Sequence, residues 1–453
     1  MEKAISQEQQ PFRQKLAEIV GPENVITDNR ETAAYEVDGL TPKTVIFAAS
    51  TEQIAQIIKQ ANESRTSIIP WGSGSRQQVG PCLSAADAVL CLKQMNRITE
   101  LEAGNFTVQV EAGMVNGQLQ KQLAEHRFFF PLDPPYPETS TIGGEIATNA
   151  TGPWRFMYGS VRDLVLGVTV VTPAGDIIHS GGKTMKNVAG LDLCKMYIGS
   201  GGTLGIITQA VLRLFPLPEV SKSLCMTFVN YEDAFRLTAQ ILNSVLTPSA
   251  IELIDWVAGG NLGEACPSQM GENDVLLIVK IEGDDKAVAR HEKEITALAE
   301  ANKAKNIATL EGEKSNRVWQ AYREIHKLLL SAAPEKVQGK ASVPISKLGN
   351  MFSTVKEIGR RYFTQIAIRA HGGNGILYPY FATSNQNVPI ISELRQAALS
   401  LGGYFMVEAA PLWVRKKVEL LPRRNDYALM KRLKTEFDPN NILNPGRVVG
   451  GLY

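Results

Sequence analysis

The chain has 453 residues, 44% of them hydrophobic and 21% charged, and its 47 basic and 46 acidic residues leave a net charge of +1. This composition is that of a soluble globular protein, and the balance of charge excludes a bulk field that would recruit nucleic acid or an anionic membrane. The length predicts two or three domains.

No segment indicates export, a membrane span or a cluster of metal-binding cysteines. The first 13 residues are polar, and the most apolar segments, such as 164–171, are far shorter than the roughly 20 residues that a spanning helix needs. The five cysteines are widely spaced and include no C-x-x-C pair, which argues against a disulfide framework and an iron–sulfur cluster. We therefore expect a cytoplasmic protein with reduced thiols.

The first clear pattern is a strand, a helix and a second strand. After a polar helix and loop over residues 1–35, an apolar strand is expected at 45–47. Ser50 and Gln53 form a capping-box signal, and the apolar residues after them recur at the spacing of a core-facing helix. A second strand is expected over 67–70.

The second strand leads directly into a glycine-rich loop at residues 71–76. Such a loop can offer consecutive backbone N–H groups to a phosphate. It is not a Rossmann fingerprint, because the third glycine is missing and no helix pattern follows. An ordinary turn explains the loop equally well.

Small residues then gather at three places between Thr139 and Thr208, namely 141–144, 147–152 and 200–205. Their small side chains allow a large flat ligand to approach the backbone, and we interpret the region as a flavin cradle. The surrounding elements are expected to be strands at 107–111 and 166–172, a helix at 117–125 and a rigid proline-rich connection at 130–137.

After Leu217–Pro218 the pattern changes to an alternation typical of a smaller α+β domain. The sequence shows no internal repeat. Strands are expected at 224–229, 250–254, 275–282 and 404–407, and helices at 233–243, 286–303, 391–401 and 425–437.

Five motifs, in order, resemble those of a known family: PWGSGSR, TIGGEIATNATG, YGSVRDLVLGVTVVTPAGD, KNVAGLDLCKMYIGSGGTLGIIT and ILNPGRV. They are similar to the FAD-linked 2-hydroxyacid dehydrogenases and oxidases, whose FAD domain is shared with the vanillyl-alcohol oxidases. The resemblance implies an α+β fold in four parts. These are an N-terminal helix and loop (1–40), a two-part FAD-binding domain of the PCMH type (41–219), a smaller ferredoxin-like α+β cap or substrate domain (220–420), and a C-terminal segment that returns to the flavin and packs on the FAD domain (421–453).

The resemblance also implies which residues hold FAD. They are Pro70, Trp71, Gly72, Ser73, Gly74 and Ser75 at the pyrophosphate; Asp133, Pro134, Thr141, Gly143 and Gly144 along the ribityl chain and ring; Ala147, Asn149, Ala150 and Gly152 facing the cofactor; Gly205 and Ile206 at the adenine side; and Asn444 near the isoalloxazine. A turn would explain Asn149 equally well. Some relatives attach FAD covalently through a histidine near the glycine loop, where this chain has Arg76-Gln77-Gln78, so we expect non-covalent binding.

At the catalytic end the chain departs from the family pattern. Catalytically complete relatives carry H-x-G-D-G-N-L-H and then E-H-G, whose histidines hold a divalent metal. This chain has HGGNGILY at 371–378 and EAA at 408–410, so two of the three expected histidines are missing and we expect no metal site. His371 and Glu408 are the matching candidates that remain.

The catalytic candidates are His371, Glu408 and Arg323, and two of them have a second interpretation. His371 is a candidate to accept the substrate hydroxyl proton, or it is only a hydrogen-bonded residue at the end of a strand. Arg323 resembles the arginine that relatives place near the substrate carboxylate, but a solvated helix charge explains it as well. Lys340 resembles a family segment at the edge of the active site.

Intact flavin motifs beside an eroded metal site are similar to the second FAD subunit of bacterial glycolate oxidase, the one whose sister carries the complete histidine set. The resemblance implies an FAD subunit of a glycolate or D-lactate dehydrogenase complex, together with a sister FAD subunit and an iron–sulfur subunit. Two alternatives stay open: a self-sufficient FAD-dependent 2-hydroxyacid dehydrogenase, and a non-catalytic scaffold. The chain has no cysteine array and no nicotinamide fingerprint, so electrons are expected to leave the flavin for an external acceptor.

Overall fold

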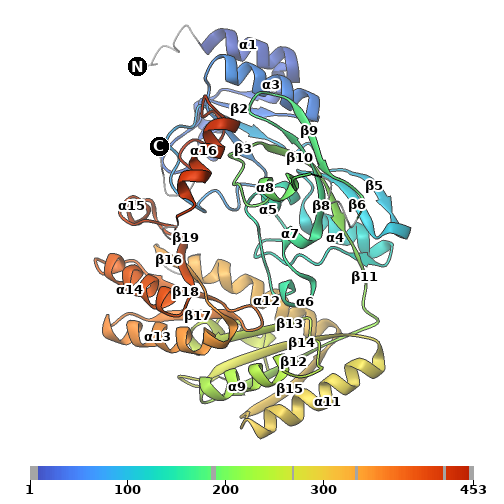
Figure 1. Ribbon diagram of the computed structural model, residues 1–453, viewed down its shortest axis with the longest axis vertical. Coiled ribbons are helices and arrows are strands. Elements are labelled where there is room, and N and C mark those ends of the chain that lie inside the picture. The colour runs from blue at the N-terminus through green and yellow to red at the C-terminus, as the bar shows by residue number, and fades with distance from the viewer. Residues whose placement is uncertain (1–8, 185–189, 268–269, 332–334, 422–424, 448–453) are drawn as a thin grey trace. The chain divides into compact units, whose positions relative to one another are not determined.

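The computed structural model describes residues 9–184, 190–267, 270–331, 335–421 and 425–447 (Figure 1). It separates into two compact units. The first unit comprises residues 1–150, 160–216 and 423–453, and the second comprises 151–159 and 217–422. Residues 151–159 therefore group with the second unit, whereas the family resemblance implies a continuous FAD-binding domain over 41–219. Residues 185–189 of the fourth family motif lie outside the described part of the chain.

The first unit begins with a four-stranded sheet in the order β1-β2-β4-β3. The strands are β1 (Val25–Ile26), β2 (Thr44–Phe47), β3 (Ile68–Trp71) and β4 (Ala88–Cys91), of which β2, β4 and β3 run parallel. Helix α3 (Thr51–Glu63) connects β2 to β3 and begins at Ser50, whose Oγ accepts a hydrogen bond from the Gln53 N–H at 3.2 Å. The predicted strand, helix and strand are confirmed.

The larger sheet of the first unit has five antiparallel strands in the order β5-β6-β10-β8-β9. Its strands are β5 (Ile98–Glu102), β6 (Thr107–Glu111), β8 (Val165–Val171), β9 (Ile177–Gly181) and β10 (Ile206–Arg213). One continuous apolar core joins this sheet to helices α1 (Gln9–Val20), α3 and α4 (Asn116–Glu125). The short helix α5 (Ile142–Ala147) follows the proline-rich connection, which contains no strand from residue 130 to 140.

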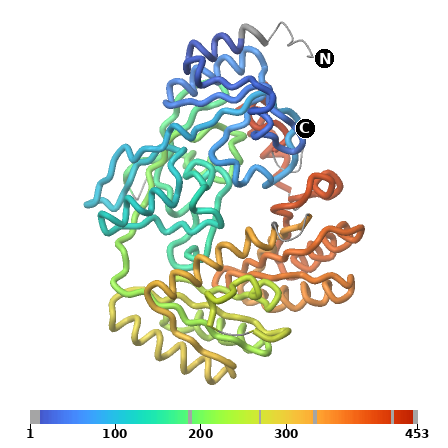
Figure 2. Tube along the Cα trace, turned by 180° about the vertical axis from the view of Figure 1, so that it is seen from behind, coloured from blue at the N-terminus to red at the C-terminus, as the bar shows by residue number. Residues whose placement is uncertain are grey.

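The end of the chain returns to the first unit, as the sequence predicted. Helix α16 (Tyr427–Phe437) and the residues after it lie beside the N-terminal strands, red beside blue in Figure 2. The Ile68 N–H donates to the Ile442 carbonyl at 2.7 Å, and the Asn444 N–H donates to the Ile68 carbonyl at 3.0 Å. Strand β3 is therefore flanked by the C-terminal segment, which places Asn444 next to the glycine loop.

The second unit is built on one eight-stranded antiparallel sheet in the order β15-β12-β14-β13-β17-β18-β16-β19. It consists of two successive β-α-β-β-α-β halves with the same internal strand order, which is the ferredoxin-like arrangement. The first half is β12 (Val220–Phe228), α9 (Tyr231–Leu242), β13 (Ala250–Asp255), β14 (Val275–Gly283), α11 (Asp285–Ala301) and β15 (Asn306–Glu311). The second is β16 (Lys336–Ser342), α13 (Leu348–Arg361), β17 (Ile366–His371), β18 (Ile376–Ala382), α14 (Asn387–Ser400) and β19 (Tyr404–Ala409).

This repetition of topology was not predicted from the sequence, which shows no internal repeat. The two halves share topology but not a visible sequence pattern, and strands β13 and β17 join them. Helices α9, α11, α13 and α14 pack on one face of the sheet, and the connecting helix α12 (Gly312–Ser331) packs on the other. Among the described residues, no helix is both long and apolar enough to cross a membrane.

Candidate functional site

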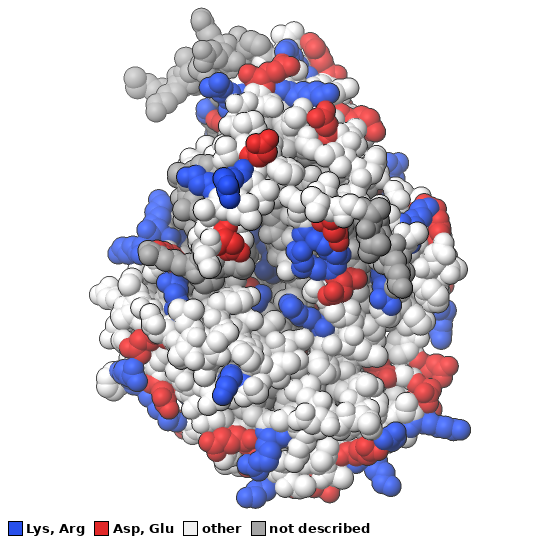
Figure 3. Space-filling view, viewed as in Figure 1, with Lys and Arg blue, Asp and Glu red and all other residues white. Residues whose placement is uncertain are grey.

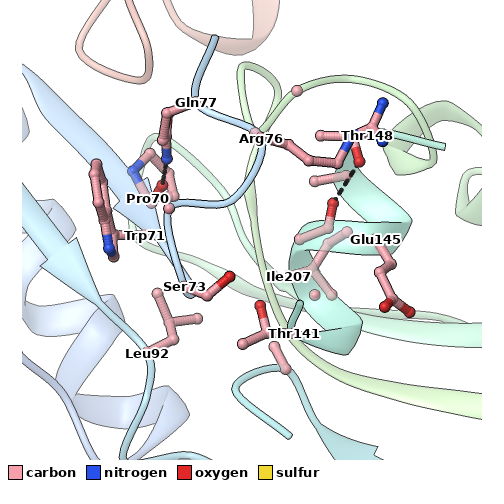
Figure 4. A pocket seen from close by; sticks show the side chains of 18 of the residues that line it. Pro70, Trp71, Ser73, Arg76, Gln77, Leu92, Thr141, Glu145, Thr148 and Ile207 are labelled. Atoms are coloured by element: carbon pink, nitrogen blue, oxygen red, sulfur yellow. Dashed lines mark hydrogen bonds between the residues drawn. The ribbon is translucent and has the colours of Figure 1, made fainter. Parts of the chain in front are cut away.

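A pocket in the first unit contains about 960 Å³ of empty space, part of it open to solvent. Its wall is formed by the loop after β3, by α5 and the residues before it, by the loop that precedes β10, and by Asn444 (Figure 4). These segments are far apart in the sequence. The return of the C-terminal segment beside β3 completes the wall.

The structure brings thirteen of the predicted cofactor residues into this wall. They are Pro70, Trp71, Gly72, Ser73, Gly74, Ser75, Thr141, Gly143, Gly144, Ala147, Gly205, Ile206 and Asn444. Five predicted residues do not line it: Asp133, Pro134, Asn149, Ala150 and Gly152. Of these, Asp133 is buried beside the pocket, and Gly152 belongs to the second unit.

Two glycines in the loop after β3 are required by their surroundings. A Cβ atom on Gly72 would lie 2.0 Å from the Thr141 Oγ1, and one on Gly74 would lie 2.3 Å from the Trp71 ring. Gly74 also has a φ of +79°, which favours glycine. Any side chain at these positions would push the loop away from the wall, so glycine keeps the bare backbone at the pocket.

Asn444 carries an unused hydrogen-bond acceptor in this pocket. Its Nδ2 donates to the Gly201 carbonyl at 2.7 Å, which fixes the orientation of the amide. Its buried Oδ1 has no partner among the described residues. Because buried polar atoms in native proteins are normally paired, this oxygen fits a ligand that donates an N–H, as a flavin ring does.

Two arginines of the pocket were not predicted as site residues. Arg76 lines the wall, and in Figure 4 its side chain extends toward Thr148, directly after α5. Arg447 donates to the carbonyls of Gln77 and Val79, the latter at 2.8 Å, and so holds the segment after the glycine loop. Sequence reasoning considered Arg76 only as a departure from the covalent attachment position. The feature that could have indicated Arg76 is a positive charge directly after a loop of the kind that binds phosphate.

Glu145 on α5 is a further residue that sequence reasoning missed. The carboxyl group is fully buried, and it accepts hydrogen bonds from the Ser140 hydroxyl at 2.5 Å and the Asn116 Nδ2 at 3.0 Å. Burial raises its pKa to about 7, while the two hydrogen bonds and the positive charge of Arg76 act in the opposite direction. The pocket wall therefore contains a carboxyl group that titrates near neutral pH.

The predicted catalytic residues lie in the second unit. His371 ends β17, and its Nδ1 lies 2.7 and 2.8 Å from the two carboxylate oxygens of Glu252. Glu408, on β19, lies with Oε1 3.3 Å from the Lys340 ammonium and accepts a hydrogen bond at Oε2 from the Gln338 Nε2 at 3.1 Å. Arg323 is half-buried on α12.

These side chains do not fit a divalent metal. Lys340 already places a positive charge on Glu408, and Nδ1 of His371 is engaged by Glu252. Tyr378 and Ala409 supply no nitrogen ligand where the family motifs have histidine. In the described part of the chain, no group of three or more His, Cys, Asp or Glu side chains could hold a metal ion. The residues of this site therefore give no reason to assign a step of the reaction to a metal.

Two family models match the chain. The model described as "FAD binding domain" matches residues 42–181, and "FAD linked oxidases, C-terminal domain" matches residues 217–448. Together they match most of the chain, with residues in both units.

Curated relatives match over nearly the whole length. The chain is 31% identical to glycolate oxidase subunit GlcD of Bacillus subtilis, over 96% of each protein, and 30% identical to D-lactate dehydrogenase of Archaeoglobus fulgidus, over 89% of this chain and 91% of that protein. The sequence interpretation pointed to the second FAD subunit of glycolate oxidase, whereas the relative found here is the one named GlcD.

Solved structures share the fold. One is p-cresol methylhydroxylase with substrate bound, with a TM-score of 0.75, 17% identity and 98% coverage of each chain. Another is alkyldihydroxyacetonephosphate synthase, with a TM-score of 0.76, 20% identity and coverage of 96% of this chain and 84% of that one.

Proposed function

Because the chain belongs to the FAD-linked oxidases, we propose that it is the FAD-binding component of a dehydrogenase that oxidises a small 2-hydroxy acid such as glycolate or D-lactate. The relatives named glycolate oxidase subunit and D-lactate dehydrogenase support this substrate class. The observation that carries the proposal is the pairing of His371 with Glu252, which gives a buried imidazole a fixed orientation. Such an imidazole is suited to accept a proton from a hydroxyl group.

In this reaction the 2-hydroxy acid becomes a 2-oxo acid and loses a hydride from C2 and a proton from its hydroxyl group. When bound, FAD supplies the acceptor for the hydride. We assign the proton to Nε2 of His371. Arg323 is proposed to bind the substrate carboxylate, because a guanidinium can contact both oxygens at once.

The first unit supplies the binding site for FAD in this proposal. The bare loop 72–75 would receive the pyrophosphate through backbone N–H groups, Arg76 would balance its charge, and Asn444 would accept a hydrogen bond from the flavin ring. Among the residues that the structure describes, no histidine lines the pocket, which supports non-covalent binding. For the five predicted residues outside the wall, contact with FAD stays a prediction.

Electrons must leave the reduced flavin, and we propose that they pass to an external acceptor. The subunit name of the Bacillus relative favours a complex, in which a sister FAD subunit and an iron–sulfur subunit would be the partners. Relatives named D-lactate dehydrogenase favour the second candidate, a self-sufficient enzyme. The two candidates differ only in where the electrons go after the flavin.

Anaerobic mixing of the FAD-loaded chain with glycolate or D-lactate tests the proposal. We expect bleaching of the flavin absorption, with the same rate after dialysis against EDTA, because the residues do not fit a metal. Re-oxidation by artificial acceptors without other proteins would favour the self-sufficient enzyme, whereas a requirement for co-purifying subunits would favour the complex. A yellow protein that no 2-hydroxy acid reduces, alone or with its co-purifying proteins, would refute the proposal.

A further inference from the structure

The two halves of the second unit meet at a single pair of strands, β13 and β17. In this pairing Glu252 lies directly opposite His371, Leu253 opposite Ala370 and Ile254 opposite Arg369. The side chains of Glu252, His371 and Arg369 lie on the face of the sheet that α12 covers, together with Tyr322 of α12. Residues from both halves and from their connecting helix therefore meet at one place.

The carboxylate of Glu252 accepts hydrogen bonds from two donors at this junction. Both of its oxygens contact the His371 Nδ1, at 2.7 and 2.8 Å, and Oε2 also accepts a short hydrogen bond from the Tyr322 hydroxyl. Glu252 and Tyr322 are fully buried, and His371 is 3% exposed. A fixed hydrogen-bonded chain, Tyr322–Glu252–His371, runs from α12 to the end of β17.

The surroundings of Tyr322 keep its hydroxyl group protonated. Burial raises the pKa of Tyr322 and the Glu252 carboxylate raises it further, so the phenol stays neutral and can donate. The guanidinium of Arg369 lies 4.2 Å from the centre of the Tyr322 ring and compensates the buried negative charge. With a carboxylate as acceptor, the proton of a neutral His371 resides on Nδ1.

The other ring nitrogen of His371 is left open. Among the described residues, the side-chain hydrogen bonds of His371 are made by Nδ1 and none by Nε2, and the imidazole packs edge-to-face with Tyr378, with ring centres 5.3 Å apart. A neutral imidazole with its proton on Nδ1 has its lone pair on Nε2. The ring therefore presents a base in one tautomer and one orientation.

A buried carboxylate is a costly way to join two strands. Burying an ionised group is unfavourable unless it is paired, and the neighbouring pair Leu253–Ala370 shows that apolar residues serve this junction. This cost is explained if the Glu252 carboxylate fixes the orientation of the His371 imidazole.

We propose that Glu252 is a positioning residue that, with Tyr322, holds His371 in the Nδ1–H tautomer so that Nε2 can accept the hydroxyl proton of the 2-hydroxy acid. This inference rests on the proposed function. It assigns a role to a residue that no sequence motif indicated. The same arrangement of carboxylate and imidazole orients histidine bases in other enzymes.

The hydrogen bond can be tested without any turnover. In the full-length chain labelled with ¹⁵N-histidine, we expect one strongly downfield imidazole proton that disappears in H371Q, and nitrogen shifts that report the Nδ1–H tautomer. E252Q should abolish this signal. D255N removes another buried carboxylate of β13, one that pairs with Lys356 instead, and should retain it, which makes it the matched control.

The rate of flavin reduction then tests whether this orientation of His371 speeds the reaction. E252Q is expected to slow flavin reduction by the 2-hydroxy acid about 100-fold at saturating substrate, with KM changed about twofold or less, because orientation and not binding is lost. E252D should recover part of the rate. If E252Q does not fold, Y322F removes one of the two donors and should slow reduction about tenfold while the downfield proton persists at a changed shift.

A downfield signal that survives in E252Q, or reduction at the wild-type rate in E252Q or in Y322F, would overturn the inference. An intact signal in a protein that no 2-hydroxy acid reduces would refute the proposed function and leave the hydrogen-bond assignment standing. The two failures are thus distinguishable.

Discussion

Glu145 is the residue of the cofactor pocket whose ionisation is most strongly altered by its surroundings. Its carboxyl group faces Ser140, Asn116, Arg76 and Asp133, and burial is the largest influence on its pKa. Near neutral pH, the Glu145 carboxyl group keeps a proton in the folded protein that it loses in the unfolded chain. Folding stability and proton binding are therefore linked at this residue.

The stability of the protein is expected to depend on pH through Glu145. Because the pKa of Glu145 is about 7 in the folded protein and 4.5 ordinarily, its contribution to stability is fully present below pH 4.5 and is lost as the pH rises to 7. Relative to E145Q, the free energy of unfolding of the cofactor-free wild type should fall by about 3 kcal/mol across that window. Urea unfolding at a series of pH values measures it.

Glu138 provides the control, since it is exposed in the turn just before the same helix. E138Q should follow the wild-type pH dependence. Parallel curves for wild type and E145Q would show that Glu145 does not retain its proton on folding.

Helix α16 is attached to the cofactor region through one buried lysine. The Lys434 ammonium donates to the carbonyls of Thr203 at 2.8 Å and Leu443 at 2.9 Å, and it pairs with Asp438 at 2.5 Å. Asp438 in turn accepts from the N–H groups of Ile442 and Leu443. This element therefore connects the loop before β10 to the segment that carries Asn444.

Removal of this lysine should weaken both the fold and the cofactor site. K434M leaves the Asp438 carboxylate and two carbonyls buried without their donor, and breaking a buried pair in this way costs about 3–5 kcal/mol. We expect that loss in urea unfolding, together with a weaker affinity for FAD measured by fluorescence quenching. R432A, an exposed change on the same helix, should alter neither quantity, and an equal effect of both variants would contradict the role of Lys434.

At the scale of the whole molecule, the two units have separate apolar cores. The cofactor pocket belongs entirely to the first unit, and the Tyr322–Glu252–His371 chain belongs entirely to the second. On the face shown in Figure 3, basic and acidic side chains are interspersed and form no patch of one sign. This agrees with the net charge of +1, and it favours partners chosen by shape over partners chosen by bulk charge.

Because the units have separate cores and the pocket lies in the first, we expect FAD to stabilise the first unit more than the second. At a concentration of FAD 100 times its Kd, the free energy of unfolding of the first unit should rise by about 2.7 kcal/mol. Hydrogen exchange followed by mass spectrometry should show this protection in β3, α5 and β10, and less in β12 and β15. Equal protection of every strand would indicate that the units unfold as one.

Local patterns were sufficient to predict several elements of each unit. The capping signal at Ser50, the apolar spacing after it and the strand at Thr107–Glu111 were predicted correctly, because hydrogen bonds at helix ends and alternating burial depend on neighbours in sequence. The repeated βαββαβ topology was missed, because two halves can share strand order without sharing side chains.

The amino-acid sequence alone was enough to identify a flavoprotein family, since a bare backbone at a cofactor requires small residues in consecutive positions, and these are visible as motifs. The tertiary structure decided the groups that act by proximity. Glu252 and His371 are 119 positions apart in the chain, and the charge of Arg76 acts on Glu145 only because the glycine loop and α5 share one pocket. Burial, hydrogen bonding and charge pairing depend on distance in space, which no local pattern records.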